Sequence, residues 1–323
     1  MLFQILIIVT YYIRMKILIT GGAGQIAYSL IPLLLSVNIF NTKIDLILLD
    51  IEPCMEKLEG VKMELEDSNF EYLNSLIITS DLKTAFSDID IAILLGGFPR
   101  IPGMERKDLL EKNFEIFKIQ GIALNNYANQ NVKVLVVANP VNTNCWIVNK
   151  FSPNIPSENF TSYSYLDQER LAYLLQNKYN QRYENIKNII IWGNHSSTMV
   201  PDVSIYDSKI KLDDDDIYII QNRGASVIEK RKLSSSMSAA NGIIKHIKKW
   251  FHGSDDEIIS FGVYNKNSYK FPEDMFIAMP VKTYKFFNYS VINDLQIDNK
   301  TRTLIEISIK ELKEEIDLVK NLL

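Results

Sequence analysis

Residues 16–27 read KILITGGAGQIA, and this stretch decides the fold. A short apolar run rich in isoleucine is followed directly by Gly21, Gly22 and Gly24. Glycines between a strand and a helix permit a tight turn, and they let backbone N–H groups approach a pyrophosphate. The glycine pattern alone also fits an ordinary strand–helix turn. The stretch therefore predicts a strand, a turn and a helix, with a dinucleotide site as the functional interpretation.

The next apolar run, residues 44–49 (IDLILL), is followed by Asp50. In a dinucleotide-binding fold, a carboxylate at the end of the second strand accepts hydrogen bonds from the ribose hydroxyls of the adenosine. The same charge would repel a 2′-phosphate, so Asp50 favours NAD over NADP. The alternative is that Asp50 caps the helix that follows. Together with the glycines, Asp50 predicts an NAD site.

Apolar runs continue to alternate with longer amphipathic segments. Residues 89–95 (IDIAILL) and 132–138 (VKVLVVA) resemble strands that are buried on both faces of a parallel sheet. Residues 107–128, between them, repeat apolar side chains at helical spacing. This alternation predicts an α/β fold with a Rossmann-type, doubly wound parallel sheet. We expect this NAD-binding domain to cover residues 15–158.

The pattern changes after about residue 158. The strands that we expect there, in 189–194 (IIIWGN) and 203–210 (VSIYDSKI), are shorter and more polar. Two long helical stretches follow, over residues 222–250 and 300–322. We therefore expect a second, α+β domain over residues 159–323, which binds the substrate and carries catalytic residues.

Composition excludes several classes of protein. The 323 residues include 35 Lys and Arg and 39 Asp and Glu, so the formal charge of −4 gives no support for nucleic-acid binding. With 47% apolar residues, extensive disorder is not expected. Cys54 and Cys145 are the only cysteines and cannot make a disulfide framework or a structural zinc site by themselves. We expect a reducing compartment and no metal.

Residues 2–13 (LFQILIIVTYYI) form a separate apolar run at the N-terminus. About 20 such residues are needed to cross a bilayer, and no basic residue precedes the run as in a signal peptide. We therefore favour an N-terminal extension, residues 1–14, which a start codon placed too far upstream would explain, over a membrane anchor. We expect a cytoplasmic protein whose fold and activity survive deletion of these residues.

Of the three histidines, His195 is the candidate catalytic base. It follows a β-branched strand in WGNHSS, whereas His246 and His252 lie in KHIKKWFH, which indicates a solvated helix end. Proton removal from an alcohol suits a histidine held by a carboxylate. LDQER offers Asp167 for this purpose, and Arg170 would lie on the same face of a helix.

Residues 96–106 (GGFPRIPGMER) follow the run that ends at residue 95. Ligands of open parallel sheets bind outside the carboxyl ends of the strands. Arg100 and Arg106 have the planar guanidinium that binds carboxylates with two hydrogen bonds. The alternative is a flexible surface loop with exposed arginines.

Taken together, these motifs closely resemble malate dehydrogenases of the cytosolic type, within the lactate/malate dehydrogenase superfamily. The shared strings run in order from Met15 to about Ala240, and a weaker resemblance continues to the C-terminus. They are TGGAGQIAYSL, LLD, FPRIPGMERKDLLEKN, ANPVNTNC, LDQER, IWGNHSSTMVPDV and KLSSSMSAA.

The resemblance implies NAD-dependent interconversion of L-malate and oxaloacetate by a homodimer. It makes His195 the proton acceptor, oriented by Asp167, while Arg106 polarises the carbonyl and Arg170 and Arg100 bind the two carboxylates. Cofactor contacts carry over to Gly21, Gly22, Ala23, Gly24, Gln25, Ile26, Ala27, Asp50, Asn113, Gln120, Val137, Ala138 and Asn139. Asn139 is also expected to reach the substrate.

Two features depart from the family pattern. Between Lys209 and Gln221 the chain is shorter than the family, which has a further strand and helical segment there. Tyr165 stands where the family often has arginine.

Three alternatives remain from the sequence. Tyr183 and Lys187 have the Tyr-x-x-x-Lys spacing of extended short-chain reductases and epimerases, although they lead into a strand. A lactate dehydrogenase is the nearer rival, and Arg100 argues against it. A non-catalytic NAD-binding protein is the third, and the shortened segment keeps it open.

Overall fold

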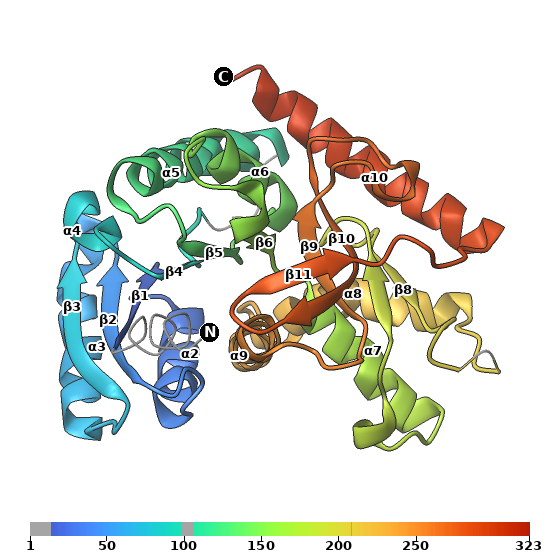
Figure 1. The fold of residues 1–323 in the computed structure, drawn as a ribbon, viewed down its shortest axis with the longest axis horizontal. Coiled ribbons are helices and arrows are strands. Elements are labelled where there is room, and N and C mark those ends of the chain that lie inside the picture. Colours follow the sequence, from blue (N-terminus) through green and yellow to red (C-terminus); the bar gives the residue numbers. More distant parts are fainter. Residues whose placement is uncertain (1–13, 99–105, 208) are drawn as a thin grey trace, which may run out of the picture.

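The computed structural model describes residues 14–98, 106–207 and 209–323. A nine-stranded sheet runs through the whole molecule in the order β11-β10-β9-β6-β5-β4-β1-β2-β3 (Figure 1). Six of the strands are parallel: β1 (Arg14–Thr20), β2 (Lys43–Leu49), β3 (Leu73–Thr79), β4 (Ile91–Leu94), β5 (Lys133–Val136) and β6 (Phe160–Ser162). The sequence analysis predicts four of them, and β3 and β6 are additional. Three antiparallel strands extend the sheet: β9 (Ile259–Tyr264), β10 (Phe276–Tyr284) and β11 (Asn288–Val291).

A two-stranded antiparallel sheet, β7 (Ile190–Trp192) and β8 (Val200–Asp202), lies in the C-terminal half. The helices are α2 (Gln25–Ser36), α3 (Met55–Ser68), α4 (Leu82–Phe86), α5 (Arg106–Tyr127), α6 (Val141–Lys150), α7 (Tyr165–Lys178), α8 (Asp214–Arg231), α9 (Met237–His252) and α10 (Asn299–Lys320). Short 3₁₀ helices are η1 (Glu52–Cys54), η2 (Ser157–Asn159), η3 (Tyr183–Asn185) and η4 (Ser268–Lys270). Within the described ranges, no helix is long and apolar enough to cross a membrane.

The central strands of the parallel part are buried on both faces, because helices cover both sides. All four residues of β4 are buried, and so are the last four of β1. This burial explains why the strands read as continuous apolar runs. The predicted fold class, a Rossmann-type doubly wound parallel sheet with a second α+β domain, is therefore confirmed.

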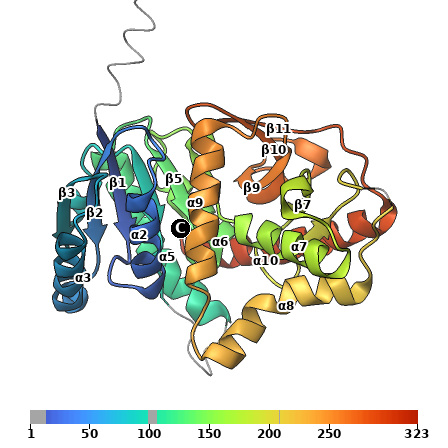
Figure 2. The ribbon, with the colours of Figure 1, turned by 90° about the horizontal axis from the view of Figure 1, so that it is seen from below.

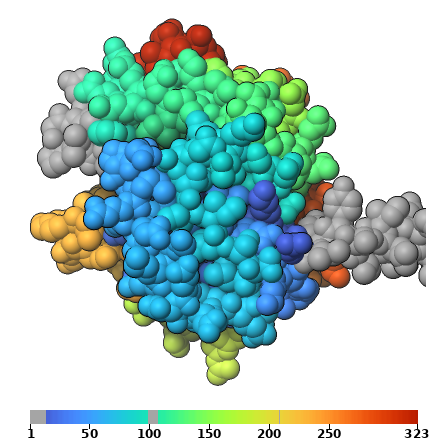
Figure 3. Space-filling model, turned by 90° about the vertical axis from the view of Figure 1, so that its left-hand side faces the viewer, coloured from blue at the N-terminus to red at the C-terminus, as the bar shows by residue number. Residues whose placement is uncertain are grey.

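The two lobes meet along helices. Figure 2 shows α9 beside α2, with the rest of the C-terminal half on the far side of α9. The end of the molecule at the β3 edge of the sheet is formed mainly by the first lobe, coloured blue to green in Figure 3. The sheet itself passes from one lobe to the other where β6 pairs with β9 at Ser162 and Gly262.

Three boundaries differ from the sequence prediction. β1 begins at Arg14, before the expected Lys16, because Arg14 pairs with Lys43 of β2. The strand expected over residues 203–210 does not form in its described part, where residues 204–206 and 209 are turns. The helix expected over 222–250 is two helices, because the chain takes a left-handed conformation at Lys232, with φ of 59°, before the serine-rich connection to α9.

Candidate active site

The glycine turn joins β1 to α2 and packs tightly against the end of β4. Gly21 has a φ of 67°, and a Cβ atom there would lie 2.7 Å from Cα of Gly96. Gly24, the residue before α2, has no side chain with which to cap the helix. The first N–H groups of α2 are therefore left for an external acceptor, which is the arrangement that binds a phosphate. The turn fits the pyrophosphate of a dinucleotide.

Asp50 faces this turn from the end of β2. Its Oδ2 accepts the N–H of Ala23 at 2.9 Å, and its Oδ1 accepts the N–H of Ile51 at 2.9 Å. The residue before η1 is Ile51, so Asp50 does not cap that helix. The carboxylate thus holds the glycine turn against β2, at the place where the sequence analysis expects a ribose.

The other candidate NAD contacts lie on α5 and directly after β5. Asn113 is fully buried and uses its amide within the protein, because Oδ1 accepts the N–H of Phe98 at 2.9 Å and Nδ2 donates to the carbonyl of Leu109 at 3.0 Å. Gln120 is also buried, and its Oε1 has no hydrogen-bond partner in the described part of the chain. Val137, Ala138 and Asn139 follow β5 directly.

Asp167, Arg170 and His195 come together as the sequence predicts. Asp167 and Arg170 lie one turn apart near the start of α7, and His195 lies in the loop between β7 and β8. Nδ1 of His195 is 2.5 Å from Oδ2 of Asp167, and an Nη1 proton of Arg170 is donated to Oδ1 at 2.8 Å. Asp167 is fully buried, while the side chains of His195 and Arg170 are each 15% exposed.

The electrostatics of this group keep Asp167 ionised. Burial alone would raise the pKa of Asp167, but the charges and hydrogen bonds of His195 and Arg170 outweigh it and hold the pKa below its ordinary value. An ionised carboxylate accepts the Nδ1 proton of His195, which leaves Nε2 as the ring nitrogen that can accept a proton. The arrangement is that of a histidine base oriented by a carboxylate.

His195 opens onto a cavity of about 430 Å³ between the two lobes. Arg170 and Asn139 line the same cavity, together with Ile26 from the start of α2. The cavity therefore connects the base, a cation for an anionic substrate and the glycine turn. The expected substrate residue Arg100 lies outside the described residues, and so does the side chain of Arg106, the first residue of α5.

The sequence analysis missed one wall of this cavity, which α8 provides. Asn222, Gly224 and Ala225 line it, and a Cβ atom at Gly224 would lie 3.7 Å from Nη2 of Arg170. It also missed Asn142, whose Oδ1 accepts the backbone N–H of His195 at 2.9 Å. Asn142 stands in the string ANPVNTNC, at the start of α6, so its place in that string was the available signal.

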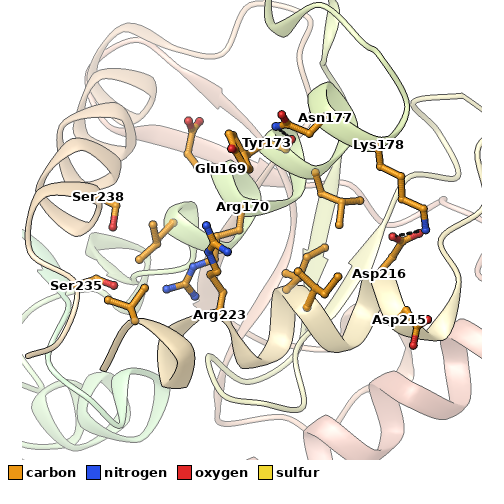
Figure 4. Close-up of a pocket in the computed structure, with 15 residues that line it drawn as sticks. Glu169, Arg170, Tyr173, Asn177, Lys178, Asp215, Asp216, Arg223, Ser235 and Ser238 are labelled. Carbon is orange, nitrogen blue, oxygen red and sulfur yellow. Dashed lines mark hydrogen bonds and ion pairs between the residues drawn. The ribbon is translucent and has the colours of Figure 1, made fainter. Parts of the chain in front are cut away.

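A second cavity, of about 580 Å³, lies on the other side of Arg170, between α7 and α8. Figure 4 shows the guanidinium groups of Arg170 and Arg223 next to one another at one end of this cavity. At the other end, Lys178 forms an ion pair with the buried Asp216 at 2.7 Å. Arg170 thus borders both cavities.

The prediction that His246 lies at a solvated helix end is wrong. His246 is fully buried on the inner face of α9, stacks on Phe261 with ring centroids 3.7 Å apart, and lies 3.1 Å from the hydroxyl of Thr161. Burial lowers its pKa to about 3, so it is neutral. His252, at the end of the same helix, is exposed as expected.

The Tyr-x-x-x-Lys alternative also fails on geometry. Tyr183 lies in the short helix η3 and its hydroxyl contacts Glu169 and Lys245, far along the chain from the glycine turn. Lys187 follows it on an exposed loop. The reductase chemistry needs both residues on one helix beside the cofactor, so this reading is excluded.

Comparison with known proteins agrees with this geometry. Residues 15–161 match the family model described as the NAD-binding domain of lactate/malate dehydrogenase, and residues 164–323 match its α/β C-terminal domain. The cytoplasmic malate dehydrogenase of Gallus gallus is 45% identical, over 93% of this chain and 95% of the relative. Among solved structures, a malate dehydrogenase of Naegleria fowleri has a TM-score of 0.92 at 39% identity, covering 96% of this chain and 99% of that one.

A Trichomonas vaginalis lactate dehydrogenase, solved with NADH and oxamate, has a TM-score of 0.90 at 33% identity, covering 95% of this chain and 98% of that one. The matches span both lobes and nearly the full length of each relative. The chain therefore belongs to the lactate/malate dehydrogenase family.

Proposed function

We propose that the chain is an NAD-dependent malate dehydrogenase, which interconverts L-malate and oxaloacetate. The observation that carries this proposal is the contact of His195 and Arg170 with one buried carboxylate, Asp167, at the mouth of a cavity beside the glycine turn. The similarity to cytoplasmic malate dehydrogenases over 93% of the chain supports it.

NAD is the cofactor of the proposed reaction, and when bound it accepts the hydride from C2 of the hydroxy acid. The glycine turn and the start of α2, Gly21 to Ala27, would hold its pyrophosphate, and Asp50 its adenosine ribose. Asn113, Gln120, Val137, Ala138 and Asn139 are proposed as further contacts. The unpartnered Oε1 of the buried Gln120 supports a bound polar group in that region.

The proton is handled by His195. Its Nε2 accepts the hydroxyl proton of malate, and the ionised Asp167 stabilises the imidazolium that results. In the opposite direction the same nitrogen returns the proton to the oxygen of the reduced carbonyl. Because Asp167 is buried and hydrogen-bonded, its interaction with the imidazolium is weakly screened by solvent.

Charge selects the substrate. Malate is a dianion, and Arg170 is proposed to bind the carboxylate next to the reacting carbon while Arg100 binds the distal one. Arg106 is proposed to stabilise the negative charge on the carbonyl oxygen, and Asn139 to contact the substrate. Two cations on the carboxylates restrict the orientation of C2 relative to the cofactor.

We further propose two domains, 15–158 for NAD and 159–323 for the substrate, in a homodimer located in the cytoplasm. The boundary between the matched family domains, at residues 161–164, supports the division. The names of the similar relatives support the location. The homodimer rests on the family resemblance.

One assay tests the function: NADH oxidation by the full-length chain with oxaloacetate, with pyruvate, and with no substrate. We expect turnover with oxaloacetate and a preference over pyruvate of up to about 10⁴-fold in kcat/KM, since pyruvate would leave a cation without its partner. His195→Asn should bind NADH as the unchanged chain does and lose at least 10²-fold in kcat. No turnover with either acid would refute the proposal, and faster turnover with pyruvate would indicate a lactate dehydrogenase.

In the Arg100→Gln variant the preference should shift towards pyruvate.

A further inference from the structure

The loop that carries His195, residues 193–198, packs against the C-terminal helix α10. Gly193 has a φ of 93°, and a Cβ atom there would lie 2.3 Å from Oγ of Ser308 on α10. The next backbone N–H, that of Asn194, is donated to the same Oγ at 2.9 Å. The catalytic base is therefore one residue away from a direct contact with an element more than 100 residues later in the chain.

Glu311 makes most of the remaining contacts between α10 and this loop. Its Oε2 accepts a hydrogen bond from Nδ2 of Asn194 at 3.1 Å, from Oγ1 of Thr198 at 2.7 Å, and from Oγ of Ser196. The residues on both sides of His195 thus donate to one carboxylate oxygen. Hydrogen bonds to an ionised acceptor are about twice as strong as neutral ones.

Glu315 extends the same contact to α6. Its Oε1 accepts from Nδ2 of Asn194 at 3.2 Å, and its Oε2 accepts from the hydroxyl of Thr143. The neighbour of Thr143 in α6 is Asn142, which binds the backbone N–H of His195. Ser308, Glu311 and Glu315 lie on one face of α10, at the three- and four-residue spacing of a helix.

We propose that Glu311 is a positioning residue for the proposed dehydrogenase reaction, acting through the loop 193–198 on the orientation of His195. The proposal rests on the proposed function of His195 as the base. Asp167 fixes the ring of His195 from the side of α7, while Glu311, from the side of α10, binds the side chains of Asn194, Ser196 and Thr198 in the same loop. Both are needed, because a shift of the loop would move Nε2 of His195 away from the substrate even while Nδ1 stays bonded to Asp167.

Glu311→Ala removes the acceptor and tests the proposal. With oxaloacetate and NADH, we expect kcat to fall by about 10²-fold, the loss that a shift of roughly 1 Å can cause. The KM for oxaloacetate and the Kd for NADH should stay within about twofold, since Arg170 and the glycine turn do not contact Glu311. Glu311→Gln keeps a carbonyl oxygen as acceptor, so it should recover most of the lost kcat.

The matched control is Glu314→Ala, an exposed glutamate on the same helix, which should have the kcat of the unchanged chain. A pair of variants at Thr198 covers the case in which Glu311→Ala does not fold. Thr198→Val should lower kcat with KM unchanged, and Thr198→Ser, which keeps the hydroxyl, should not. If the unchanged chain is active and folded Glu311→Ala or Thr198→Val keeps its kcat, the proposal is overturned. An inactive unchanged chain would instead refute the proposed function.

Discussion

A single buried carboxylate, Asp167, binds two partners in the candidate active site, a histidine and an arginine. One oxygen contacts Nδ1 of His195 and the other accepts from Arg170. Sharing explains why a fully buried acid keeps a lowered pKa, since each partner offsets part of the cost of burial. It also means that the base and the proposed substrate-binding arginine are positioned by one residue.

Asp167→Asn should therefore lower kcat much more than it weakens the binding of NADH. The amide retains the shape of the side chain but loses the charge that fixes the tautomer of His195 and stabilises its imidazolium form. We expect kcat to fall by about 10⁴-fold, as for the equivalent change in a serine protease triad. Steady-state kinetics with oxaloacetate and fluorescence titration with NADH would measure this, and a Kd for NADH changed by more than about threefold would contradict it.

His246 gives a prediction about stability and pH. Its pKa is about 3 in the folded chain, against an ordinary value of 6.5, because burial disfavours the charged ring. A depressed pKa contributes stability above pH 6.5, and that stability is lost as the pH falls towards 3. Below pH 6.5 the free energy of unfolding should fall by about 1.4 kcal/mol per pH unit from this residue alone.

Urea unfolding at pH 7 and pH 5 would test this. The unchanged chain should lose about 2 kcal/mol more between the two values than His246→Gln, which does not titrate. The same change at the exposed His252 is the control and should leave the pH dependence as it is. Equal slopes for the unchanged chain and His246→Gln would show that His246 is not neutral in the fold.

The contrast between two histidines shows what the sequence could and could not predict at this scale. His195 was identified from two short motifs. A strand comes directly before it, and the separate motif LDQER places a carboxylate and an arginine at helical spacing. The burial of His246 depends on which face of α9 packs against Phe261 of β9, a contact between segments that no local pattern describes. The charged residues beside it indicated the outer face of the same helix.

At the level of elements, β6 and β9 approach one another closely at Gly262. A Cβ atom at Gly262 would lie 1.7 Å from Oγ and 2.8 Å from the carbonyl oxygen of Ser162. Only glycine lets the two strands pair at this distance. The pairing joins the parallel part of the sheet to the antiparallel part.

Gly262→Ala should consequently lower the free energy of unfolding by at least about 1–3 kcal/mol, the usual cost of overpacking. Gly60→Ala is the opposite case, because Gly60 lies inside α3 with nothing within 4 Å of a Cβ atom. That change should raise stability by about 0.5–1 kcal/mol. Thermal unfolding of the two variants should shift the Tm in opposite directions, and a Gly262→Ala variant as stable as the parent would contradict the tight pairing.

The elements of the first lobe were predicted better than those of the second. Buried parallel strands are continuous apolar runs, so the positions of the four predicted strands are visible in the sequence even though their ends differ by up to two residues. The stretch 222–250 has helical spacing throughout, and its break depends on a left-handed residue, Lys232, that is not glycine. Residues 203–207 include β-branched and aromatic side chains, yet residues 204–206 form a turn directly after β8, which ends at Asp202.

At the scale of the whole molecule, one sheet crosses from the proposed NAD domain into the proposed substrate domain. The cavity with His195 lies beside this crossing, with walls from α2 in one lobe and α7 and α8 in the other. Substrate and cofactor can therefore meet only where both lobes are folded.

The shared sheet should make unfolding a single event. Trp146 lies in the first lobe and Trp192 and Trp250 in the second, all buried. Tryptophan fluorescence and far-ultraviolet circular dichroism should report coincident transitions in denaturant, as in a two-state protein. Two separated transitions would mean that the lobes are independent in spite of the sheet.

The pairing of Ser162 with Gly262 also sets a limit on how the polypeptide can be divided. Two fragments produced separately, 1–162 and 163–323, would each expose an unpaired strand edge, that of β6 in the first and that of β9 in the second. Exposed strand edges drive association. Each piece alone should be poorly soluble, whereas co-expression should allow the edges to find one another and restore NADH oxidation. A cut at this junction would thus turn an intramolecular pairing into a recognition site between two chains.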